Sequence, residues 1–312
     1  MINEYQYNIS VVIVSYNVCD YIIEGIESLY KFSQFPIQII LVDNNSSDNT
    51  LSSVRAKFPD VLIIENKENV GFSAANNQGF QLCTGNYILL FNPDAALVEN
   101  SLELMIKEID LRVGKDVLLG TKLINTDNSI QASCWKFPNP IQHLLELFFL
   151  NTWMNISQYQ SDLLIETREV DFISGALIFM HVETLKKLKG LDVNLFWMDD
   201  VDLCKRNIEL GGKNIYFPHT KIKHHIGKSS KKNLNIVISN QIISKLKFYK
   251  KHKQVSYFLI SVPIFILQIL SRVPLFFIIG LFKKEYLIKC KAYIYTFSKM
   301  MNYLFFRKQS VI

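Results

Sequence analysis

The sequence predicts an α/β fold with a mostly parallel sheet, flanking helices and a separate C-terminal helical segment. Two observations lead to this prediction. Over residues 9–91, continuous apolar runs of strand length alternate with segments of helical periodicity, as in βαβ units. Charge also divides the chain: residues 1–220 carry 16 basic and 27 acidic side chains, whereas residues 221–312 carry 18 basic side chains and one acid, Glu285.

Each strand and helix is predicted from its local pattern. Short runs of mostly apolar and β-branched residues predict the first strands, at 9–14, 37–42, 61–64 and 87–91. Such runs are typical of strands that helices cover on both faces. Apolar residues at helical spacing predict helices at 21–30 and 74–82. Further strands are expected at 116–123, 170–180 and 214–217, the last closed by Pro218, with an inserted helical element at 137–164.

The cysteines and the N-terminal residues limit the class of protein. Five cysteines are scattered along the chain without a Cys-x-x-Cys pair, so neither a disulfide framework nor a zinc site is expected. The polar residues 1–8 lead directly into the first strand, so we expect no signal peptide and a cytosolic location.

Polar side chains follow the first two strands at the sheet edge where ligands bind in α/β proteins. Ser15, Tyr16 and Asn17 follow the first strand, and Asp43 and Asn45 follow the second. Because Asp43 comes directly after Ile-Leu-Val, we expect its carboxylate to accept a hydrogen bond from a base or a ribose. The alternative is that the acids of this turn only cap the next helix.

The run Asn92-Pro93-Asp94 ends the fourth strand and delivers a carboxylate to the same edge. Hard cations such as Mg²⁺ prefer oxygen ligands and bind through one or two carboxylates together with substrate phosphates. We therefore predict that Asp94 holds a divalent cation against a diphosphate. His224 follows a later strand and is expected to bind the same cation or the phosphates, while His225 points to the opposite face.

The segment 69–79, NVGFSAANNQG, is predicted to be a loop that runs into a helix. Helix N-termini attract anions, so Asn69, Gly71 and Asn76 are candidates for lining a nucleotide pocket. Ordinary capping and close packing explain these residues equally well. The segment is neither a Walker loop nor a dinucleotide fingerprint.

Three acids, Asp199, Asp200 and Asp202, stand at a predicted helix start directly after Phe196 and Trp197. Adjacent carboxylates repel one another, which a purely structural segment would tend to avoid. Asp200 is the candidate general base, and the two aromatic rings are candidates for stacking against an acceptor sugar. Helix capping by acids is the alternative.

These motifs together resemble glycosyltransferase family 2, the inverting transferases with an A-type nucleotide-binding fold, and most closely its rhamnosyltransferase-like branch. The matching motifs occur in family order over residues 9–230: VSYN (14–17), VDNNSSDNT (42–50), NVGFSAANNQG (69–79), LLFNPDAAL (89–97), SGALIF (174–179), MDDVDLCKR (198–206) and HHIGKSS (224–230). The resemblance implies a catalytic domain at 1–230.

The resemblance also implies roles for individual residues. Residues 15–17 would lie beside the nucleotide, and Asp43 would contact a pyrimidine. Asn92 and Asp94 stand where the family has its Asp-x-Asp metal motif, so Mg²⁺ or Mn²⁺ is the implied cofactor. His224 matches the His of the family's H-x-x-G-x-S segment. Asp199 and Asp200 stand where the family often has Glu-Asp, whose second acid is the base. The sequence departs from this pattern at Asn92 and Asp199.

Residues 231–312 are predicted to associate with an anionic membrane surface. Arg272 is the only charged residue in 255–282, and lysines flank that window on both sides. Pro263 and Pro274 interrupt the window, and a span would place Lys283 and Lys284 on the outer face, so helices that lie in the membrane plane or re-enter it are favoured over a span. A helical subdomain packed on the core is the alternative. A nucleic-acid partner is not expected, because the lysines flank apolar residues.

The implied function is inverting transfer of a single sugar from a nucleoside-diphosphate sugar, with dTDP-rhamnose as the donor that the branch suggests. The acceptor is expected to be a saccharide or a lipid-linked saccharide, in cell-surface polysaccharide synthesis at the cytoplasmic face of the membrane. The Gln-x-x-Arg-Trp motif of processive relatives is absent after residue 206, which favours single-sugar addition. Alternatives are an inactive sugar- or nucleotide-binding relative, or a sugar nucleotidyltransferase, although SYNVCDY lacks the glycine-rich loop of the latter.

Overall fold

A computed structural model describes residues 9–112, 114, 116–150, 154, 157, 159, 165–225 and 234–305. The chain divides into two units. The first comprises Met1–Lys136, Gln158–Val193 and Asp199–Ser229. The second comprises Phe137–Ser157, Asn194–Met198 and Ser230–Ile312.

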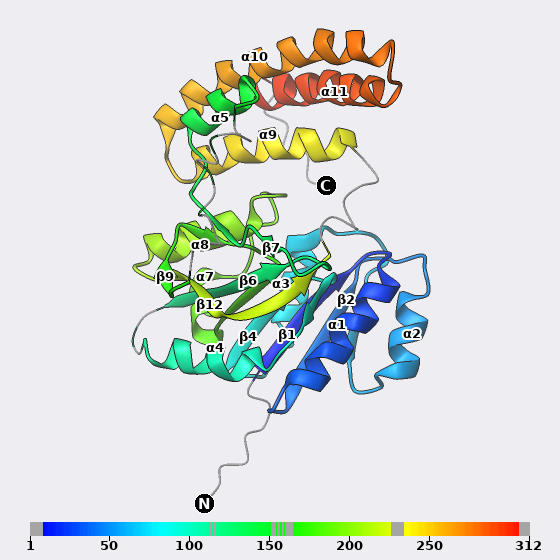
Figure 1. Cartoon of the computed structure of the whole chain (residues 1–312), viewed down its shortest axis with the longest axis vertical. Coiled ribbons are helices and arrows are strands. Elements are labelled where there is room, and N and C mark those ends of the chain that lie inside the picture. Colours follow the sequence, from blue (N-terminus) through cyan, green and yellow to red (C-terminus); the bar gives the residue numbers. More distant parts are fainter. Residues whose placement is uncertain are drawn as a thin grey trace, which may run out of the picture. The chain divides into compact units, whose positions relative to one another are not determined.

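The first unit is built on a ten-stranded mixed sheet (Figure 1). Its strands are β1 (Ile9–Ser15), β2 (Ile37–Asp43), β3 (Leu62–Glu65), β4 (Tyr87–Phe91), β5 (Ala95–Leu97), β6 (Val117–Ile124), β7 (Ile130–Gln131), β9 (Arg168–Glu169), β11 (Leu177–His181) and β12 (Lys213–His224). Eight of them follow the order β3-β2-β1-β4-β11-β6-β12-β5, with β7 paired to β6 and β9 to β12. A separate two-stranded sheet pairs β8 (Cys134–Trp135) with β10 (Phe172–Ile173).

Parallel pairing joins β3, β2, β1 and β4, and also joins β6 to β12. β11 runs antiparallel to β4 and β6, and β5 runs antiparallel to β12. The predicted α/β class with flanking helices is confirmed. The sheet is mixed because β5 and β11 run antiparallel to the strands beside them, which the apolar runs alone do not reveal.

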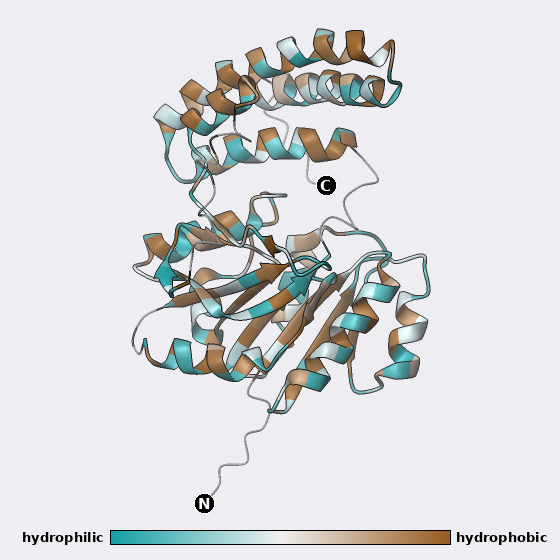
Figure 2. Ribbon diagram, in the orientation of Figure 1, coloured by the Kyte–Doolittle hydropathy of each residue, from teal (hydrophilic) through white to brown (hydrophobic). Residues whose placement is uncertain are grey.

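Helices cover both faces of this sheet. They are α1 (Cys19–Phe32), α2 (Thr50–Lys57), α3 (Phe72–Phe80), α4 (Ser101–Asp110), α7 (Val182–Leu188) and α8 (Asp199–Glu209). Alternate residues of β1 point to opposite faces: Val11 packs in the cluster that contains Ile22 of α1, whereas Val12 packs in the cluster that contains Ala75 of α3. Figure 2 shows strands of mostly hydrophobic residues and helices in which hydrophobic and hydrophilic residues are interspersed.

The second unit consists of α5 (Pro140–Leu147), α9 (Leu234–Lys251), α10 (Val255–Gly280) and α11 (Glu285–Phe305). Its core contains Leu246 of α9, Phe265 of α10, and Tyr293 and Met300 of α11. Among the described residues, α10 is the one helix that is long and apolar enough to cross a membrane by length and composition.

Three predicted elements need correction. The strand expected at 170–180 is broken into β10 and β11, because residues 174–176 turn instead of pairing. The strand expected to close at Pro218 continues to the end of β12, and the register of its pairing with β6 shifts between Phe217 and Lys221, which accommodates the proline. The prolines of residues 255–282 do not interrupt the helix, since α10 runs through both.

Part of the inserted helical element, at 151–153, 155, 156, 158 and 160–164, lies outside the described residues, as do residues 226–230 of the HHIGKSS motif.

Candidate active site

The carboxyl ends of β1 and β2 are joined by a buried hydrogen bond. Ser15 pairs in register with Asp43, and its Oγ donates to Asp43 Oδ1 at 2.8 Å. Asp43 is 1% exposed and also accepts from Ser46, through the backbone N–H at 2.8 Å and through Oγ at 2.6 Å. The predicted neighbours Ser15 and Asp43 therefore meet at the sheet edge, where Asp43 also orders the loop that follows β2.

The loops after β1 and β2 are held against each other by Asn17. Asn17 adopts a left-handed backbone with φ 54°, which asparagine tolerates better than most residues. Its N–H donates to Ser46 Oγ at 3.0 Å, and its Oδ1 accepts from Ser47 N–H at 2.7 Å. Asn45 is also left-handed, with φ 67°, and Tyr16 is exposed. The two loops thus form one ordered rim.

The loop before α3 lies on the same rim. Asn69 Oδ1 accepts from Asn44 Nδ2 at 3.1 Å and from Gly71 N–H at 3.0 Å. Gly71 has φ 88° and precedes the first turn of α3, so a side chain there would be strained. Asn76 is placed differently: its side chain is buried and donates to Phe72 O within the same helix.

Asp94 and His224 meet across the antiparallel pair of β5 and β12. His224 pairs with Ala95, the residue after Asp94. His224 Nε2 lies 3.2 Å from Asp94 Oδ1, and Asp94 is 5% exposed. His225 turns away and contacts Glu24 Oε2 of α1 through Nε2 at 3.0 Å. The backbone N–H of His225 donates to Asp94 O at 2.9 Å, but of the two histidine rings only that of His224 reaches the Asp94 carboxylate. The two predicted cation ligands are therefore adjacent.

The donor atoms at Asp94 and His224 fit a divalent cation that is completed by a substrate. Two neighbouring ligands of an octahedral ion, each about 2.1 Å from it, lie about 3.0 Å apart, close to the 3.2 Å between Asp94 Oδ1 and His224 Nε2. Within the part of the chain that the structure describes, no group of three or more His, Cys, Asp and Glu side chains gathers to hold a metal. Further ligands would come from elsewhere, such as diphosphate oxygens.

Asp199 and Asp200 begin α8 and are held by different partners. Asp200 accepts two backbone N–H bonds, from Gly175 to Oδ2 at 3.0 Å and from Val201 to Oδ1 at 2.8 Å. Ser73 Oγ of α3 lies 3.4 Å from Asp199 Oδ2. The third acid, Asp202, is buried and paired with Arg206 in the same helix, which is a structural role.

The two carboxyls differ electrostatically. Burial, together with the neighbouring charge of Asp200, raises the pKa of Asp199 to about 7. Burial also raises the pKa of Asp200, but the N–H bonds from Gly175 and Val201 favour its charged form and oppose that shift. The pair therefore holds one proton below about pH 7. Its arrangement favours Asp199 as the protonated member and Asp200 as the ionised one.

The turn at 174–176 links the two halves of the site, and the sequence motifs did not assign it a role. Gly175 N–H donates to Asp200, and the next carbonyl, Ala176 O, accepts from Asn92 N–H at 3.0 Å. A Cβ on Gly175 would lie 3.3 Å from Asp200 Cβ and Oδ2. The close approach of Gly175 to a carboxylate, together with the Ser-Gly-Ala turn after a short strand, is the signal that identifies this residue.

Phe196 and Trp197 belong to the second unit and are both exposed. Their ring centroids are 6.3 Å apart at an interplanar angle of 75°, and Trp197 has φ 72°. Their stacking against an acceptor sugar remains a prediction.

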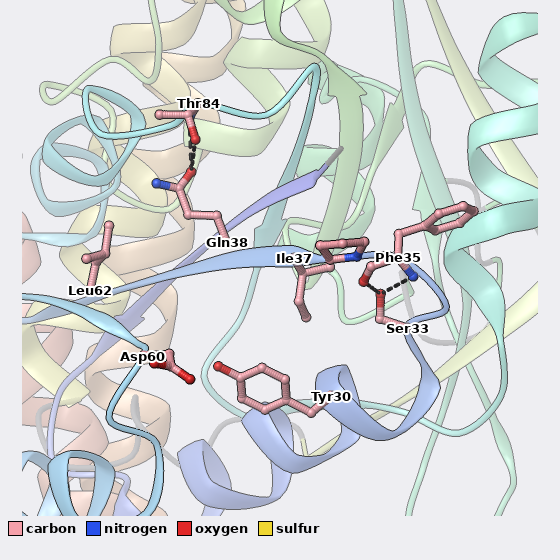
Figure 3. Close-up of a pocket in the computed structure, with 9 residues that line it drawn as sticks. Tyr30, Ser33, Phe35, Ile37, Gln38, Asp60, Leu62 and Thr84 are labelled. Atoms are coloured by element: carbon pink, nitrogen blue, oxygen red, sulfur yellow. Dashed lines mark hydrogen bonds between the residues drawn. The ribbon is translucent and has the colours of Figure 1, made fainter. Parts of the chain in front are cut away.

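A pocket of about 830 Å³ lies at the opposite edge of the sheet (Figure 3). It is lined by Tyr30, Ser33, Phe35, Pro36, Ile37, Gln38, Asp60, Leu62 and Thr84. Ile37 and Leu62 begin β2 and β3, so this pocket is at the amino ends of the parallel strands. It is separate from the carboxyl edge that carries Asp43.

Comparisons with known proteins agree with the geometry of the carboxyl edge. The family model described as "Glycosyl transferase family 2" matches residues 10–188. N-acetylglucosaminyl-diphospho-decaprenol L-rhamnosyltransferase of Mycobacterium tuberculosis is 23% identical over 236 residues, covering 70% of this chain and 76% of that protein.

Two solved structures share the fold. The mannosyltransferase PcManGT from Pyrobaculum calidifontis, in complex with GDP-Man and Mn²⁺, has a TM-score of 0.56 at 15% identity, covering 98% of this chain and 89% of its own. S. aureus TarS 1-349 in complex with UDP has a TM-score of 0.51 at 18% identity, covering 77% of this chain and 65% of its own.

Proposed function

This chain belongs to glycosyl transferase family 2 and is a glycosyltransferase, and from this premise we propose that it transfers a single sugar from a nucleoside-diphosphate sugar with inversion. The observation that carries the proposal is the linkage of two groups through one turn. Asp200 accepts from Gly175 N–H, and the Asn92-Pro93-Asp94 turn is tied to Ala176 O. A proton acceptor and a candidate diphosphate site are thereby fixed to the same turn.

Asp200 is the general base in this mechanism. Its carboxylate takes the proton of the acceptor hydroxyl as that oxygen attacks the anomeric carbon of the donor sugar. The bond from the anomeric carbon to the diphosphate oxygen breaks with its electron pair leaving on the diphosphate. A single displacement from the opposite face inverts the anomeric configuration. Asp199 supports Asp200 by taking up the first proton of the pair, so that below about pH 7 only one negative charge is present and it lies on Asp200.

Asp94 and His224 would hold Mg²⁺ or Mn²⁺. When bound, the cation supplies positive charge that stabilises the departing diphosphate. Asn92, two residues before Asp94, has a neutral amide where the family's Asp-x-Asp motif has its first acid. Asp94 is therefore the principal carboxylate ligand. The Mn²⁺ named with PcManGT supports a divalent cation in this fold.

The nucleotide is assigned to the rim formed by the loops after β1 and β2 and before α3. Ser15, Tyr16, Asn17, Asp43, Asn45, Asn69 and Gly71 are the proposed contacts, and Asn76 is proposed to support them indirectly. Support comes from the hydrogen bonds that order this rim around Asp43 and Asn69. Because Asn76 is buried and bonded within its helix, its contribution would be to hold α3 in shape.

For the substrates, we propose dTDP-rhamnose as the first donor to test and a lipid-linked saccharide as the acceptor, in cell-surface polysaccharide synthesis. The M. tuberculosis relative supports both, because its name specifies an L-rhamnosyl donor group and an N-acetylglucosaminyl-diphospho-decaprenol acceptor.

We propose that the second unit, which contains the basic residues 231–312, binds the cytoplasmic membrane surface. α10 exposes large apolar side chains, among them Leu259 at 62%, Leu267 at 55% and Phe277 at 53%. Its one charge, Arg272, turns into the unit, where its guanidinium donates to Tyr293 Oη at 2.5 Å and to Glu146 O at 2.6 Å. The charge of Arg272 therefore does not lie on the exposed apolar face of α10.

An in-plane orientation agrees better with the packing than a span does. α10 is 26 residues long, and α11 packs along it through Tyr293 and Met300. A spanning α10 would take α11 into the bilayer with Lys289, Lys291 and Lys299, and a lysine at the bilayer centre costs about 3 kcal/mol. An in-plane α10 leaves those lysines at the headgroups, where each contributes about 1 kcal/mol.

Activity is tested with the purified chain and a panel of nucleotide sugars, with Mn²⁺, Mg²⁺ or a chelator, against a short-chain polyprenyl-diphosphate saccharide. The expected result is metal-dependent release of nucleoside diphosphate together with an extended lipid product for one donor. Nucleotide binding without product for any donor would favour an inactive relative and refute the proposal.

Membrane binding is tested by co-sedimentation with vesicles that contain anionic lipid. Leu267→Glu and Phe277→Glu should each weaken binding several-fold, because each places a charge on the exposed apolar face of α10. Leu111→Glu is the matched control, since Leu111 is an 80% exposed leucine of the first unit. Equal losses for all three variants, or no loss for the α10 pair, would contradict the assignment.

A further inference from the structure

The turn and strand that carry residues 125–131 end beside His224, and no role follows for them from the sequence motifs. Gln131 of β7 is 5% exposed and contacts His224 with both ends of its amide. We propose that Gln131 is a positioning residue that fixes which ring nitrogen of His224 carries the proton, so that Nε2 is the nitrogen available to a divalent cation. This inference rests on the proposed function of Asp94 and His224.

The orientation of the Gln131 amide is set by its surroundings. Its Nε2 faces three oxygen acceptors: His224 O at 2.6 Å, Asn125 Oδ1 at 2.8 Å and Ile124 O at 3.3 Å. An amide oxygen at that position would face only other acceptors, so the NH₂ group must lie there. The amide oxygen Oε1 therefore points to His224 Nδ1, 3.1 Å away.

The same direction is imposed from the other end of a hydrogen-bond chain. Asp127 is an acceptor, and bonds from Ser129 lower the pKa of its carboxyl. Ser129 Oγ donates to Asp127 Oδ1 at 2.6 Å and accepts from Asn125 Nδ2 at 2.8 Å. The amide of Asn125 is thereby oriented with its oxygen toward Gln131. Starting from Asp127, which can only accept, each hydrogen bond fixes the orientation of the next side chain: Ser129, then Asn125, then Gln131, and finally His224.

The consequence is a defined tautomer of His224. Because Oε1 of Gln131 can only accept, Nδ1 of His224 must be an N–H. Nε2 is then the nitrogen that faces Asp94 Oδ1 at 3.2 Å. Without Gln131, a neutral His224 could put its proton on Nε2 and donate it to Asp94, which would occupy both candidate ligand atoms in one hydrogen bond.

Two measurements test the proposal in the full-length protein. The protonation of each ring nitrogen of His224 is read from ¹⁵N chemical shifts of histidine side chains in the presence of Mg²⁺ and UDP or dTDP, because without a cation Nε2 faces the Asp94 carboxylate and would carry a proton; assignment is by His224→Gln. Mn²⁺ affinity is read from electron paramagnetic resonance of free Mn²⁺ in the presence of UDP or dTDP. The wild type should show the Nδ1–H tautomer. Gln131→Met should shift it toward Nε2–H and weaken Mn²⁺ binding by the roughly 10–100-fold typical of changes to residues that orient a metal ligand.

Two further variants separate positioning from folding. Gln131→Glu keeps an acceptor for Nδ1–H but loses the donor to Asn125 and His224 O, so it should keep the Nδ1–H tautomer. Ser133→Ala is the matched control, because Ser133 is buried in the same segment and bonds to the backbone of Gln131 and Leu123, not to His224. It should leave both readouts unchanged.

The outcomes distinguish this inference from the proposed function. A wild-type His224 with its proton on Nε2, or a Gln131→Met protein with unchanged tautomer and Mn²⁺ affinity, overturns the inference while leaving the cation site intact. If Gln131→Met does not fold, the wild-type tautomer and the Gln131→Glu variant still decide it. A wild type that shows the Nδ1–H tautomer but binds no Mn²⁺ with either nucleotide supports the positioning and refutes the cation site.

Discussion

Replacing Asp200 with asparagine gives a prediction that follows from its two hydrogen bonds. Both carboxylate oxygens accept a backbone N–H, from Gly175 at 3.0 Å and from Val201 at 2.8 Å. An asparagine has one oxygen, so its NH₂ group would face one of these two donors and lose that bond. Leaving one N–H unsatisfied costs about 1–3 kcal/mol. Because the free energy of unfolding of a native domain is about 5–15 kcal/mol, most molecules should stay folded after this loss.

The effect on catalysis should be much larger than the effect on folding. Removing a general base typically lowers the rate by about 10²–10⁴-fold. Asp200→Asn should therefore lose transfer by that factor while nucleotide affinity changes less than about threefold. Turnover is measured as release of nucleoside diphosphate in the presence of acceptor, binding by calorimetry with UDP or dTDP, and folding by thermal unfolding.

The neighbouring acids provide the controls. Asp199→Asn should cost less, because Asp199 is the protonated member of the pair and its pKa is raised to about 7. For the same reason, wild-type transfer should persist as the pH falls through about 7, since Asp199 takes up the first proton and Asp200 stays ionised. The reasoning is refuted if Asp200→Asn retains near-normal transfer while Asp199→Asn or Asp202→Asn abolishes it, or if wild-type transfer falls tenfold per pH unit below about 7.

Three other perturbations test other parts of the site. Asp94→Ala should weaken Mn²⁺-dependent nucleotide binding by more than about 10–100-fold; unchanged activity across a metal titration would exclude it as a ligand. Gly175→Ala should lower kcat by about tenfold or more with little change in Tm, because its Cβ would lie 3.3 Å from the Asp200 carboxylate and displace it; an unchanged kcat would show that this approach is not critical. Between about pH 4 and 7 the folded state keeps a proton on Asp199 that the unfolded state releases. The free energy of unfolding should therefore fall as pH rises, by at most about 4 kcal/mol. In denaturant unfolding, the free energy of Asp199→Asn should depend less on pH than that of the wild type, and identical pH profiles would contradict the raised pKa.

Local pattern in the sequence was sufficient to predict the strands of the parallel part of the sheet. β1 and β4 are buried along their whole length, and β2 is buried at every residue but Gln38, so most of their residues are apolar. Asp43 and Asp94 could be predicted at strand ends, because the apolar run of β2 ends at Asp43 and that of β4 gives way to Asn92-Pro93-Asp94.

Pairings between distant segments were decided only by the tertiary structure. The 3.2 Å approach of His224 to Asp94 depends on the antiparallel pairing of β12 with β5, which joins segments more than 100 residues apart. The sequence supplied both residue types but not the register that brings them together. In the sequence Gly175 is only one residue of a motif, and its role follows from the hydrogen bond that its N–H donates to Asp200.

Helix continuity and side-chain direction were also decided by packing. Pro263 and Pro274 predict an interrupted segment, yet α10 continues through them because α9 and α11 pack along it and stabilise the helical form. In the sequence Arg272 is a single charge within an apolar window, whereas in the structure it donates to Tyr293 and to Glu146 O, which lie on other helices. A linear pattern specifies which residues are apolar and where charges stand. It does not specify which distant backbone or side chain satisfies each polar group, because that depends on contacts formed only when the chain is folded.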